Sequence, residues 1–186
     1  GIVKVGIGRA GNVIGGGDWS PHRLVPDCMK SWSNNEQVVI RNPNSTRPWQ
    51  HVLEPLSGYL LLASKLYLNQ ELRGEAFNFG PPANQNFNVM SVVKEMSKYW
   101  DKVKWENIKD TSFSESGLLK LNCDKALSKI EWEPVWNFNE TIYHTVNWYK
   151  NFYEKKDDVF QTSLKQIADY TRSAISKELS WANAKR

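Results

Sequence analysis

Four side chains on separate stretches of the sequence have the chemistry to hold a phosphorylated ligand. Arg47 carries a planar guanidinium that is always charged and matches a diphosphate. Arg23 and Arg41 add positive charge if the fold brings them to the same pocket. Asn12 lies in a Gly-rich loop and offers an amide that donates to phosphate or sugar oxygens. Two ordinary interpretations stay open: a surface ion pair for Arg47, and a tight connection for the loop.

A dinucleotide-binding motif is present in its letters but lacks its structural context. Residues 6–11 read Gly-Ile-Gly-Arg-Ala-Gly and follow an apolar stretch. A pyrophosphate site also requires a helix that opens at the third glycine. Three further glycines at 15–17 would weaken such a helix by roughly 3 kcal/mol. The sequence therefore argues against a dinucleotide site at this position.

Composition indicates a globular protein and excludes several classes. The 186 residues are 40% hydrophobic and 24% charged, enough for one compact domain, or for one domain and part of another. No apolar run is long enough to span a membrane, and the N-terminus lacks a signal-peptide pattern. The net charge of +4 is scattered along the chain and does not demand nucleic acid. Cys28 and Cys123 are expected to be reduced thiols, which favours a cytoplasmic location.

Hydrophobic periodicity predicts the elements that must position these side chains. Strands and helices alternate, which indicates the α/β class. Strands are predicted at residues 2–7, 37–41, 75–79, 102–106 and 118–122. A Gly-rich loop covers 11–22, and helices are predicted at 23–33, 54–72, from Asn88 onward, at 124–130, 139–154 and 163–179. Because the strands are short, we expect the last strand of one sheet and its loop (1–22), followed by a mixed α/β region with returning segments (23–186).

Helical spacing also predicts which faces are buried. The helix at 54–72 is expected to bury one leucine-rich face, made of Leu53, Leu56, Leu60, Ala63 and Leu66. The helix after Asn88 is expected to bury Val89, Val92, Val93, Met96 and Trp100. Ile142, Val146 and Tyr149 form the corresponding stripe of the helix at 139–154.

Four blocks of sequence carry a resemblance to a known family. They are residues 9–19 (Arg-Ala-Gly-Asn-Val-Ile-Gly-Gly-Gly-Asp-Trp), 23–27 (Arg-Leu-Val-Pro-Asp), 47–59, beginning Arg-Pro-Trp-Gln-His-Val-Leu-Glu, and 75–81 (Glu-Ala-Phe-Asn-Phe-Gly-Pro). Together they resemble the extended short-chain dehydrogenase/reductase family of nucleotide-sugar epimerases and dehydratases. Relatives acting on dTDP- or UDP-sugars have Tyr-Gly-Pro in the first block, so Ile-Gly-Gly-Gly-Asp favours the branch that uses CDP-sugars.

The resemblance implies a fold and a set of site residues. The fold is the final part of a Rossmann-type domain plus the small mixed α/β substrate-binding domain of that family. Asn12 would contact the substrate diphosphate and Arg47 would pair with it. The other implied substrate-binding residues are Arg23 and Leu24 near the nucleotide, Ile40 beside the base, and Asn78 and Glu115. Ser114 and Asn122 depart from the family pattern, which has His and Asp there.

One part of the family's machinery is missing from the sequence. The family uses bound NAD and a Tyr-x-x-x-Lys pair as catalytic base, yet none of the seven tyrosines has a lysine four residues on. The resemblance therefore implies the C-terminal portion of a dehydratase, inactive alone, with no catalytic residue of its own. Its parent would convert a CDP-hexose to the 4-keto-6-deoxy derivative, which feeds deoxysugars of surface polysaccharides such as O-antigen.

Partners and alternatives follow from the same resemblance. The expected partners are a CDP-sugar, the N-terminal half and further copies of the chain, with no nucleic acid, membrane or metal. Two alternatives stay open. One is a stand-alone module that binds nucleotide sugars, and the other is an epimerase or reductase of the same family acting on another sugar nucleotide.

Overall fold

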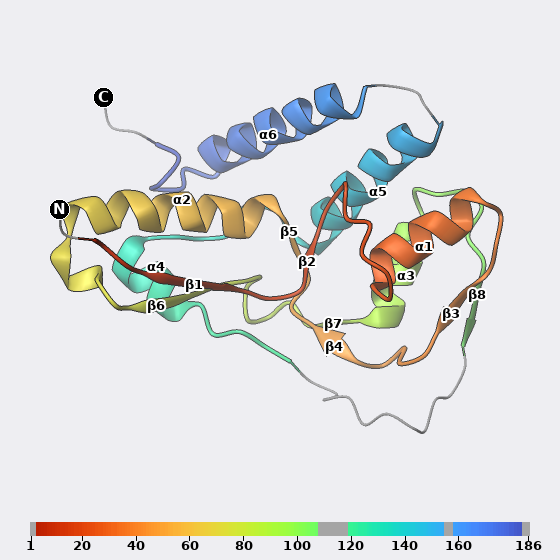
Figure 1. Cartoon of the computed structure of the whole chain (residues 1–186), viewed down its shortest axis with the longest axis horizontal. Coiled ribbons are helices and arrows are strands. Elements are labelled where there is room, and N and C mark those ends of the chain that lie inside the picture. Colours follow the sequence, from red (N-terminus) through yellow and green to blue (C-terminus); the bar gives the residue numbers. More distant parts are fainter. Residues whose placement is uncertain (1–2, 108–118, 155–157, 184–186) are drawn as a thin grey trace.

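The computed structural model describes residues 3–107, 119–154 and 158–183, and it divides into two regions (Figure 1). What we call the sheet region lies at the end where the N-terminus is found. It comprises strands β1 (Ile7–Ala10) and β6 (Ala76–Phe79) and helices α2 (Leu53–Leu68) and α4 (Asp124–Ile130). The helical region lies at the other end and contains α1 (Leu24–Ser33), α3 (Val89–Met96) and α5 (Phe138–Glu154).

The sheet region is built on one parallel strand pair. Ile7 pairs with Ala76, and Ala10 with Phe79. Helices α2 and α4 pack against these strands, and a short 3-10 helix, η1 (Gln70–Leu72), leads into β6. Gly58 allows the close approach of α2, because a Cβ atom there would lie 2.3 Å from the Phe79 ring. The core of this region consists of Leu62, Leu66, Leu72, Phe77, Phe79, Ala126, Ile130 and Trp132.

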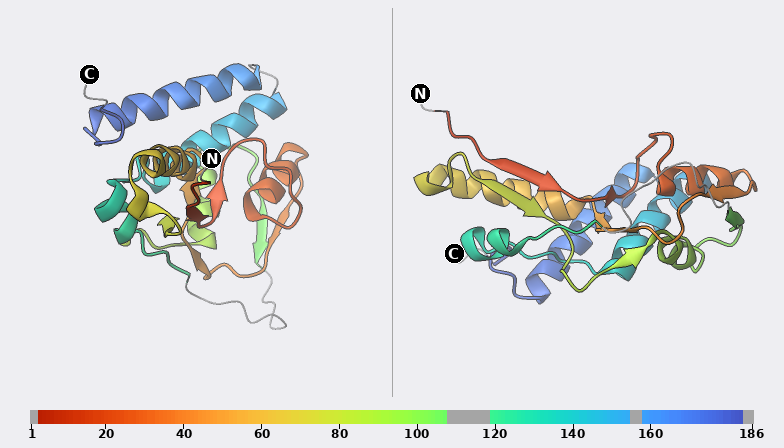
Figure 2. Two further views of the ribbon diagram at one scale, coloured as in Figure 1. Left: turned by 60° about the vertical axis from the view of Figure 1, so that its left-hand side comes forward. Right: turned by 90° about the horizontal axis from the view of Figure 1, so that it is seen from below.

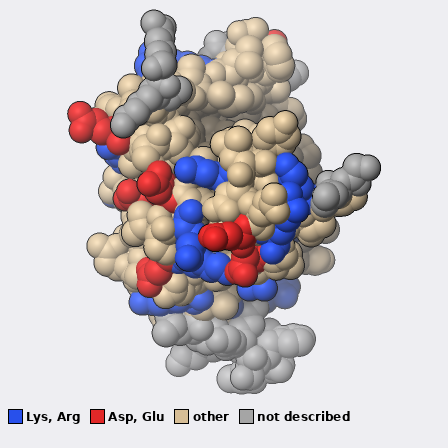
Figure 3. Space-filling view, turned by 90° about the vertical axis from the view of Figure 1, so that its left-hand side faces the viewer, with Lys and Arg blue, Asp and Glu red and all other residues tan. Residues whose placement is uncertain are grey.

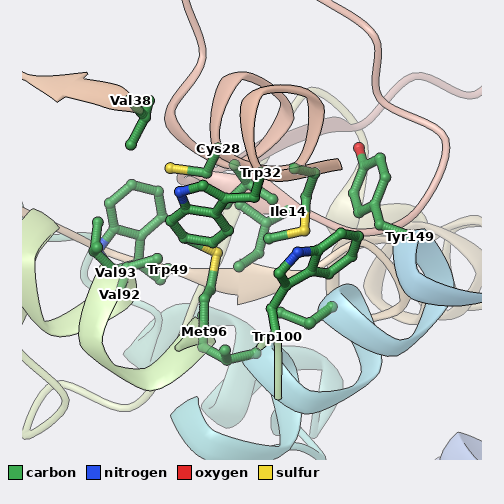
Figure 4. Close-up of a cluster of buried hydrophobic side chains, with 14 of the residues drawn as sticks. Ile14, Cys28, Trp32, Val38, Trp49, Val92, Val93, Met96, Trp100 and Tyr149 are labelled. Atoms are coloured by element: carbon green, nitrogen blue, oxygen red, sulfur yellow. The ribbon is translucent and has the colours of Figure 1, made fainter. Parts of the chain in front are cut away.

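The helical region encloses a larger aromatic core. Figure 4 shows the rings of Trp32, Trp49 and Trp100 gathered around the side chain of Met96. The Trp32 indole N–H donates to the carbonyl of Lys104 at 2.9 Å, so the ring is both buried and hydrogen-bonded. A second parallel pair, β3 (Val38–Ile40) with β8 (Trp105–Asn107), closes this end of the molecule.

Two more strand pairs lie between the regions. Strand β2 (Val13–Ile14) pairs in parallel with β5 (Gln50–His51), and β4 (Thr46–Arg47) pairs antiparallel with β7 (Phe87–Asn88). The Gly-rich loop then runs against α5, where a Cβ atom on Gly16 would lie 2.0 Å from the Trp148 ring. At Gly16 the glycine is therefore required for packing inside the protein.

Glu54 joins the two regions to the last helix, α6 (Val159–Ser176). Its buried carboxylate accepts hydrogen bonds from the backbone N–H groups of Val135 at 2.9 Å and Trp136 at 2.7 Å, and from the Tyr170 hydroxyl at 2.8 Å. Burial raises the pKa of Glu54 to about 7, although the three hydrogen bonds oppose that rise. Figures 1 and 2 show α6 as an outer layer beside α5. Glu54 thus fixes the segment before α5 and the middle of α6 at once.

The predicted α/β class is confirmed, but three predicted elements are wrong. The first strand spans Ile7–Ala10 and not 2–7, because its partner β6 begins only at Ala76. Residues 119–122 form no strand, and residue 118 lies outside the described residues. Helix α6 begins at Val159, four residues early, where Asp158 accepts a hydrogen bond from the Phe160 backbone N–H at 2.9 Å.

The predicted buried face of α2 is correct for Leu66 but wrong for three of its other members. The helix buries Glu54, Pro55, Gly58, Leu62 and Leu66. Leu60, predicted to be buried, is 74% exposed, and Leu56 and Ala63 are exposed as well. The sequence of α2 is apolar on nearly every side, so the leucine spacing alone could not identify which side meets the sheet.

The described residues hold few other chemical features. Cys28 is buried, Cys123 is half-buried, and both are free thiols. Within the described ranges, no helix is long and apolar enough to cross a membrane, and no three His, Cys, Asp or Glu side chains are grouped to hold a metal ion. Figure 3 shows acidic and basic groups intermingled on the face where the N-terminus lies, and the ion pairs Lys65–Glu131 and Lys125–Glu75 belong to this end.

Candidate functional site

The largest hollow that gathers predicted site residues lies where β1, β2, α1 and β4 meet. This main hollow has a volume of about 600 Å³. Asn12, Arg23, Leu24 and Arg47 all line it, as do Asp18 and Trp49. Two guanidinium groups and a carboxamide, carried on separate loops and strands, therefore share one cleft. The sequence motifs that hold them are up to 35 positions apart, and only the fold brings them together.

A smaller hollow adjoins the main hollow. This side hollow has a volume of about 240 Å³ and shares His22, Leu24 and Val89 with its neighbour. The end of β3 and the first turn of α1 supply the rest of its lining: Asp27, Val38, Val39, Ile40, Arg41 and Asn42. Ile40, predicted to lie beside a nucleotide base, is thus in the side hollow, together with one more arginine.

Arg23 is held in place by Asp18. Its Nη1 atom lies 3.2 Å from the Asp18 carboxylate, although 62% of the Arg23 side chain is exposed. Partial burial raises the pKa of Asp18, but the Ser20 backbone N–H and the Arg23 charge outweigh it, so the pKa is lowered. The Tyr149 hydroxyl donates to the Asp18 carbonyl at 2.6 Å. Asp18 is therefore anchored to the core and keeps Arg23 at the rim of the main hollow.

Arg47 and Asn12 are positioned by backbone pairing. Arg47 is the last residue of β4 and pairs with Phe87 of β7, and its Nη1 donates to the Thr46 carbonyl at 2.8 Å. The carbonyl of Asn12 accepts from the Gln50 backbone N–H at 3.1 Å, which holds the loop to β5. Short strands that escaped sequence prediction thus position both side chains.

One predicted site residue, Asn78, is not brought to either hollow. Asn78 donates from its amide to the Asn122 carbonyl at 2.9 Å, so it holds the segment before α4 against β6. Asn122 in turn accepts from the Asp124 backbone N–H at 2.9 Å, which is a local structural role. Glu115 lies outside the described residues, as does Ser114.

Sequence reasoning missed several residues of the two hollows. Asp18, Asp27 and Trp49 belong to the blocks that carry the family resemblance, and His22 lies between the first two blocks, yet no spacing rule marked any of them. The indole N–H of Trp49 donates to the Phe87 carbonyl at 3.0 Å and so fixes one wall. A local signal existed for Asp18 alone, because it lies five positions before Arg23 in a loop where the two charges can meet.

His51 is not a candidate acid or base. It is buried away from both hollows, beside the Trp136 ring at 4.8 Å between centroids. Burial lowers its pKa to about 3, and nearby His144 adds to the effect. Its Nδ1 accepts from the Leu53 backbone N–H at 3.3 Å, and among the described residues its Nε2 has no partner. A neutral imidazole in this setting is part of the core.

The motif at residues 6–11 has no geometry for a dinucleotide. After Gly11 the chain enters strand β2, and the next helix, α1, begins only at Leu24. The helix that such a site requires at the third glycine is therefore not found at Gly11. The described residues offer no helix N-terminus behind a Gly-rich turn, so they do not fit the pyrophosphate of NAD.

Comparison with solved structures identifies the class of fold. The chain resembles UDP-glucuronic acid 4-epimerase from Bacillus cereus, with a TM-score of 0.68 and 14% identity over 81% of this chain and 46% of that one. It also resembles dTDP-glucose 4,6-dehydratase from Bacillus anthracis, with a TM-score of 0.63 and 22% identity over 79% and 45% of the two chains. Both structures contain NAD. The chain therefore shares its fold with part of these sugar-nucleotide epimerase and dehydratase structures.

Sequence comparison narrows this class. The chain is 44% identical over 163 residues to CDP-glucose 4,6-dehydratase of Salmonella typhimurium strain LT2. The match covers 87% of this chain and 45% of that protein, so the chain spans less than half the length of its curated relative. No family model matches the chain. The resemblance found in the sequence, to the C-terminal portion of such an enzyme, is confirmed.

Proposed function

We propose that this chain is the substrate-binding C-terminal part of an NAD-dependent CDP-glucose 4,6-dehydratase. The whole enzyme would convert CDP-glucose to CDP-4-keto-6-deoxyglucose for deoxysugar synthesis. The observation that carries the proposal is the meeting of Asn12, Arg23 and Arg47 in one hollow beside a second, smaller one. The similarity to the Salmonella enzyme supports the same substrate class.

The two hollows match the parts of a nucleotide sugar. A diphosphate carries two negative charges or more, and the guanidinium groups of Arg23 and Arg47 flank the space where it would lie. The amide of Asn12 would donate to a phosphate or sugar oxygen. The side hollow would take the base, and the end of the main hollow near Ala10 and Leu121 would take the hexose.

The chain would not perform the reaction alone. No Tyr-x-x-x-Lys pair occurs in the sequence, and the described residues do not fit the NAD pyrophosphate. We propose that an N-terminal half supplies both. Its contact surface would be the edge of β1 that pairs with no described strand, together with the exposed apolar face of α2, which contains Leu56, Tyr59, Leu60 and Tyr67. We further propose that the complete enzyme is a homo-oligomer.

The experiment that tests the substrate site is calorimetry with CDP-glucose. We expect Arg47→Ala to weaken binding by roughly 2–4 kcal/mol, because a desolvated diphosphate would lose its charged partner. Arg172→Ala is the matched control, since Arg172 is an exposed arginine on α6 that pairs with Asp169. An unchanged dissociation constant for Arg47→Ala would remove this residue from the site.

A second function is favoured by one observation. Because the sequence lacks the catalytic pair, a stand-alone module that binds nucleotide sugars would need nothing beyond the two hollows. Turnover of CDP-glucose with NAD separates the possibilities. The dehydratase proposal expects no turnover by this chain and turnover after an N-terminal half is added, whereas a module gains no activity. Competition among CDP-, UDP- and dTDP-glucose tests the remaining option, an epimerase or reductase for another sugar nucleotide.

A further inference from the structure

The side hollow contains one carboxylate that the proposed binding of a diphosphate does not use. Asp27 lies in the first turn of α1, half-buried, and its backbone N–H donates to the Arg23 carbonyl at 3.0 Å. Its side chain lines the side hollow. No hydrogen bond or ion pair to this carboxylate occurs among the residues that the structure describes. An acceptor without a protein partner is therefore presented to whatever fills this space.

The rest of the side hollow suits a flat heterocycle. Leu24, Val38, Ile40 and Val89 provide apolar walls. The polar lining consists of His22, Arg41 and Asn42 in addition to Asp27. The guanidinium of Arg41 only donates hydrogen bonds, and the carboxylate of Asp27 only accepts them. The side hollow thus presents both a hydrogen-bond donor and a hydrogen-bond acceptor between apolar walls.

The neighbouring main hollow decides which part of a ligand arrives here. With a diphosphate between Arg23 and Arg47, the shared lining residues Leu24 and Val89 lead directly into the side hollow. A nucleoside attached to that diphosphate would place its base there. This step rests on the proposed function, because it takes the main hollow as a nucleotide-sugar site.

We infer that Asp27 determines specificity by accepting a hydrogen bond from the exocyclic amine of a cytosine base. Cytosine carries an amino group at C4, whereas uracil and thymine carry a carbonyl oxygen at the same position. A carboxylate pairs with the amine and repels the carbonyl, since two acceptors then face each other. Arg41 supplies a donor for the acceptor atoms of the cytosine ring. Asp27 therefore favours cytidine diphosphates and disfavours uridine and thymidine diphosphates.

The test is calorimetry with CDP and UDP as the probes. We expect the unaltered chain to bind CDP about 5- to 100-fold more tightly than UDP, the discrimination typical of one well-placed base contact. Asp27→Asn keeps the shape of the side chain, but its amide donates as well as accepts. In this variant, the ratio of the CDP affinity to the UDP affinity is expected to fall to about one, because CDP binds more weakly and UDP binds more tightly.

Three comparisons keep the result interpretable. Asp27→Glu retains an acceptor and is expected to keep CDP as the tighter ligand. Glu36→Gln removes the same charge from an exposed position just after α1 and is expected to leave the ratio unchanged. Thermal unfolding and circular dichroism establish that each variant is folded, and if Asp27→Asn does not fold, Asp27→Ser takes its place.

The outcomes separate this inference from the proposed function. Equal binding of CDP and UDP by the unaltered chain, or an unchanged ratio in Asp27→Asn, would overturn the role of Asp27 and leave a nucleotide-sugar site intact. Binding of neither CDP nor UDP would overturn the proposed function, and the role of Asp27 with it.

Discussion

The helical region and the sheet region are made from similar residues, but they enclose their hydrophobic cores to different degrees. In the helical region, aromatic and aliphatic side chains from α1, α3 and α5 enclose one another, and Trp32 and Met96 are fully buried. In the sheet region, β1 pairs within the described residues only with β6, and α2 buries a single side. Leu60 and Tyr67 are 74% and 75% exposed. One region closes its own core, whereas the other presents half of a core.

The candidate site lies at the boundary between these regions. Asn12 follows β1, whereas Arg23 precedes α1 and Arg47 ends β4. The proposed diphosphate site therefore depends on both regions and on the segments that join them. The following variants test this division, beginning with the largest expected effect.

Removal of the Glu54 carboxylate should be the most damaging change, because it acts on the junction itself. Glu54→Ala leaves two buried backbone N–H groups and the Tyr170 hydroxyl without their acceptor. We expect the free energy of unfolding to fall by about 4 kcal/mol, as measured by urea denaturation. Glu133→Ala, an exposed glutamate in the same segment, should change it by less than about 0.5 kcal/mol. Similar values for both variants would contradict the structural role of Glu54.

A cavity in the core of the helical region should cause the second-largest loss of stability. Met96→Ala removes a side chain with no exposed surface from the centre of the helical region. We expect a loss of about 3 kcal/mol in urea denaturation. The contrasting variant is Leu60→Ala in the sheet region, where an exposed leucine is shortened and the expected loss is below about 0.5 kcal/mol. Equal losses would show that Leu60 is in fact enclosed.

Overpacking tests the contact between α2 and the strand pair. Gly58→Ala would add a methyl group against the Phe79 ring. Before any relaxation, the new Cβ atom would lie 2.3 Å from the nearest ring carbon. We expect a net destabilisation of about 1–2 kcal/mol, because the better helix propensity of alanine offsets part of the steric cost. Ser64→Ala, at an exposed position of the same helix, serves as the control. Stabilisation by Gly58→Ala would mean that α2 can move off the sheet at little cost.

Two buried groups, Glu54 and His51, make the free energy of unfolding depend on pH, with slopes of opposite sign. Glu54 has its pKa raised to about 7, so its contribution is complete below pH 4.5 and is lost as the pH rises through 7. His51 has its pKa lowered to about 3, so its contribution is complete above pH 6.5 and is lost as the pH falls toward 3. Each slope is at most about 1.4 kcal/mol per pH unit.

The difference between the unaltered chain and Glu54→Gln isolates the Glu54 slope. We expect the unfolding free energy of the unaltered chain, relative to that variant, to decrease from pH 4.5 to pH 7. Urea denaturation at half-unit pH intervals measures it. A constant difference across this range would mean that Glu54 is charged throughout.

Substitutions on the exposed face of α2 should change the free energy of unfolding least but change self-association most clearly. Leu56→Lys combined with Leu60→Lys places charges on the exposed face of α2. We expect unfolding free energy to change by less than about 1 kcal/mol. Light scattering should show concentration-dependent association of the unaltered chain and a monomeric double variant. Lys94→Leu, which adds an apolar group to α3 instead, should not restore association. A monomeric unaltered chain at high concentration would contradict the half-core description.

Most of the helices could be predicted from the sequence, but the shortest strands and the buried side of α2 could not. The helices α1, α4 and α5 fall close to their predicted bounds, because each buries apolar residues at helical spacing. The strands β2, β4, β5 and β7 have two residues each, too few for any alternation to be visible. The buried side of α2 depends on where β1 and β6 lie, which no local pattern encodes.

The candidate site was accessible to sequence reasoning in part. Arg47, Arg23 and Asn12 have side chains whose chemistry suits a phosphate wherever they occur, so residue type alone made them candidates. Asn78 was assigned by resemblance, but its amide is used to hold the Asn122 carbonyl. Asp27 was overlooked because one carboxylate at a helix start is also a favourable partner for the helix dipole, and only the hollow beside it indicates another use.

The pairing of Ile7 with Ala76 bears on how the protein is made. On the ribosome, β1 is made before β6, so this pair cannot form until β6 has been translated. In the meantime α1, β3 and α2 must be synthesised, and the long intervening segment must be closed at a cost in entropy. During that interval the edge of β1 that later pairs with β6 is open to intermolecular pairing. A binding factor that shields nascent β1 should therefore raise the yield of folded chain more than one acting on the finished protein.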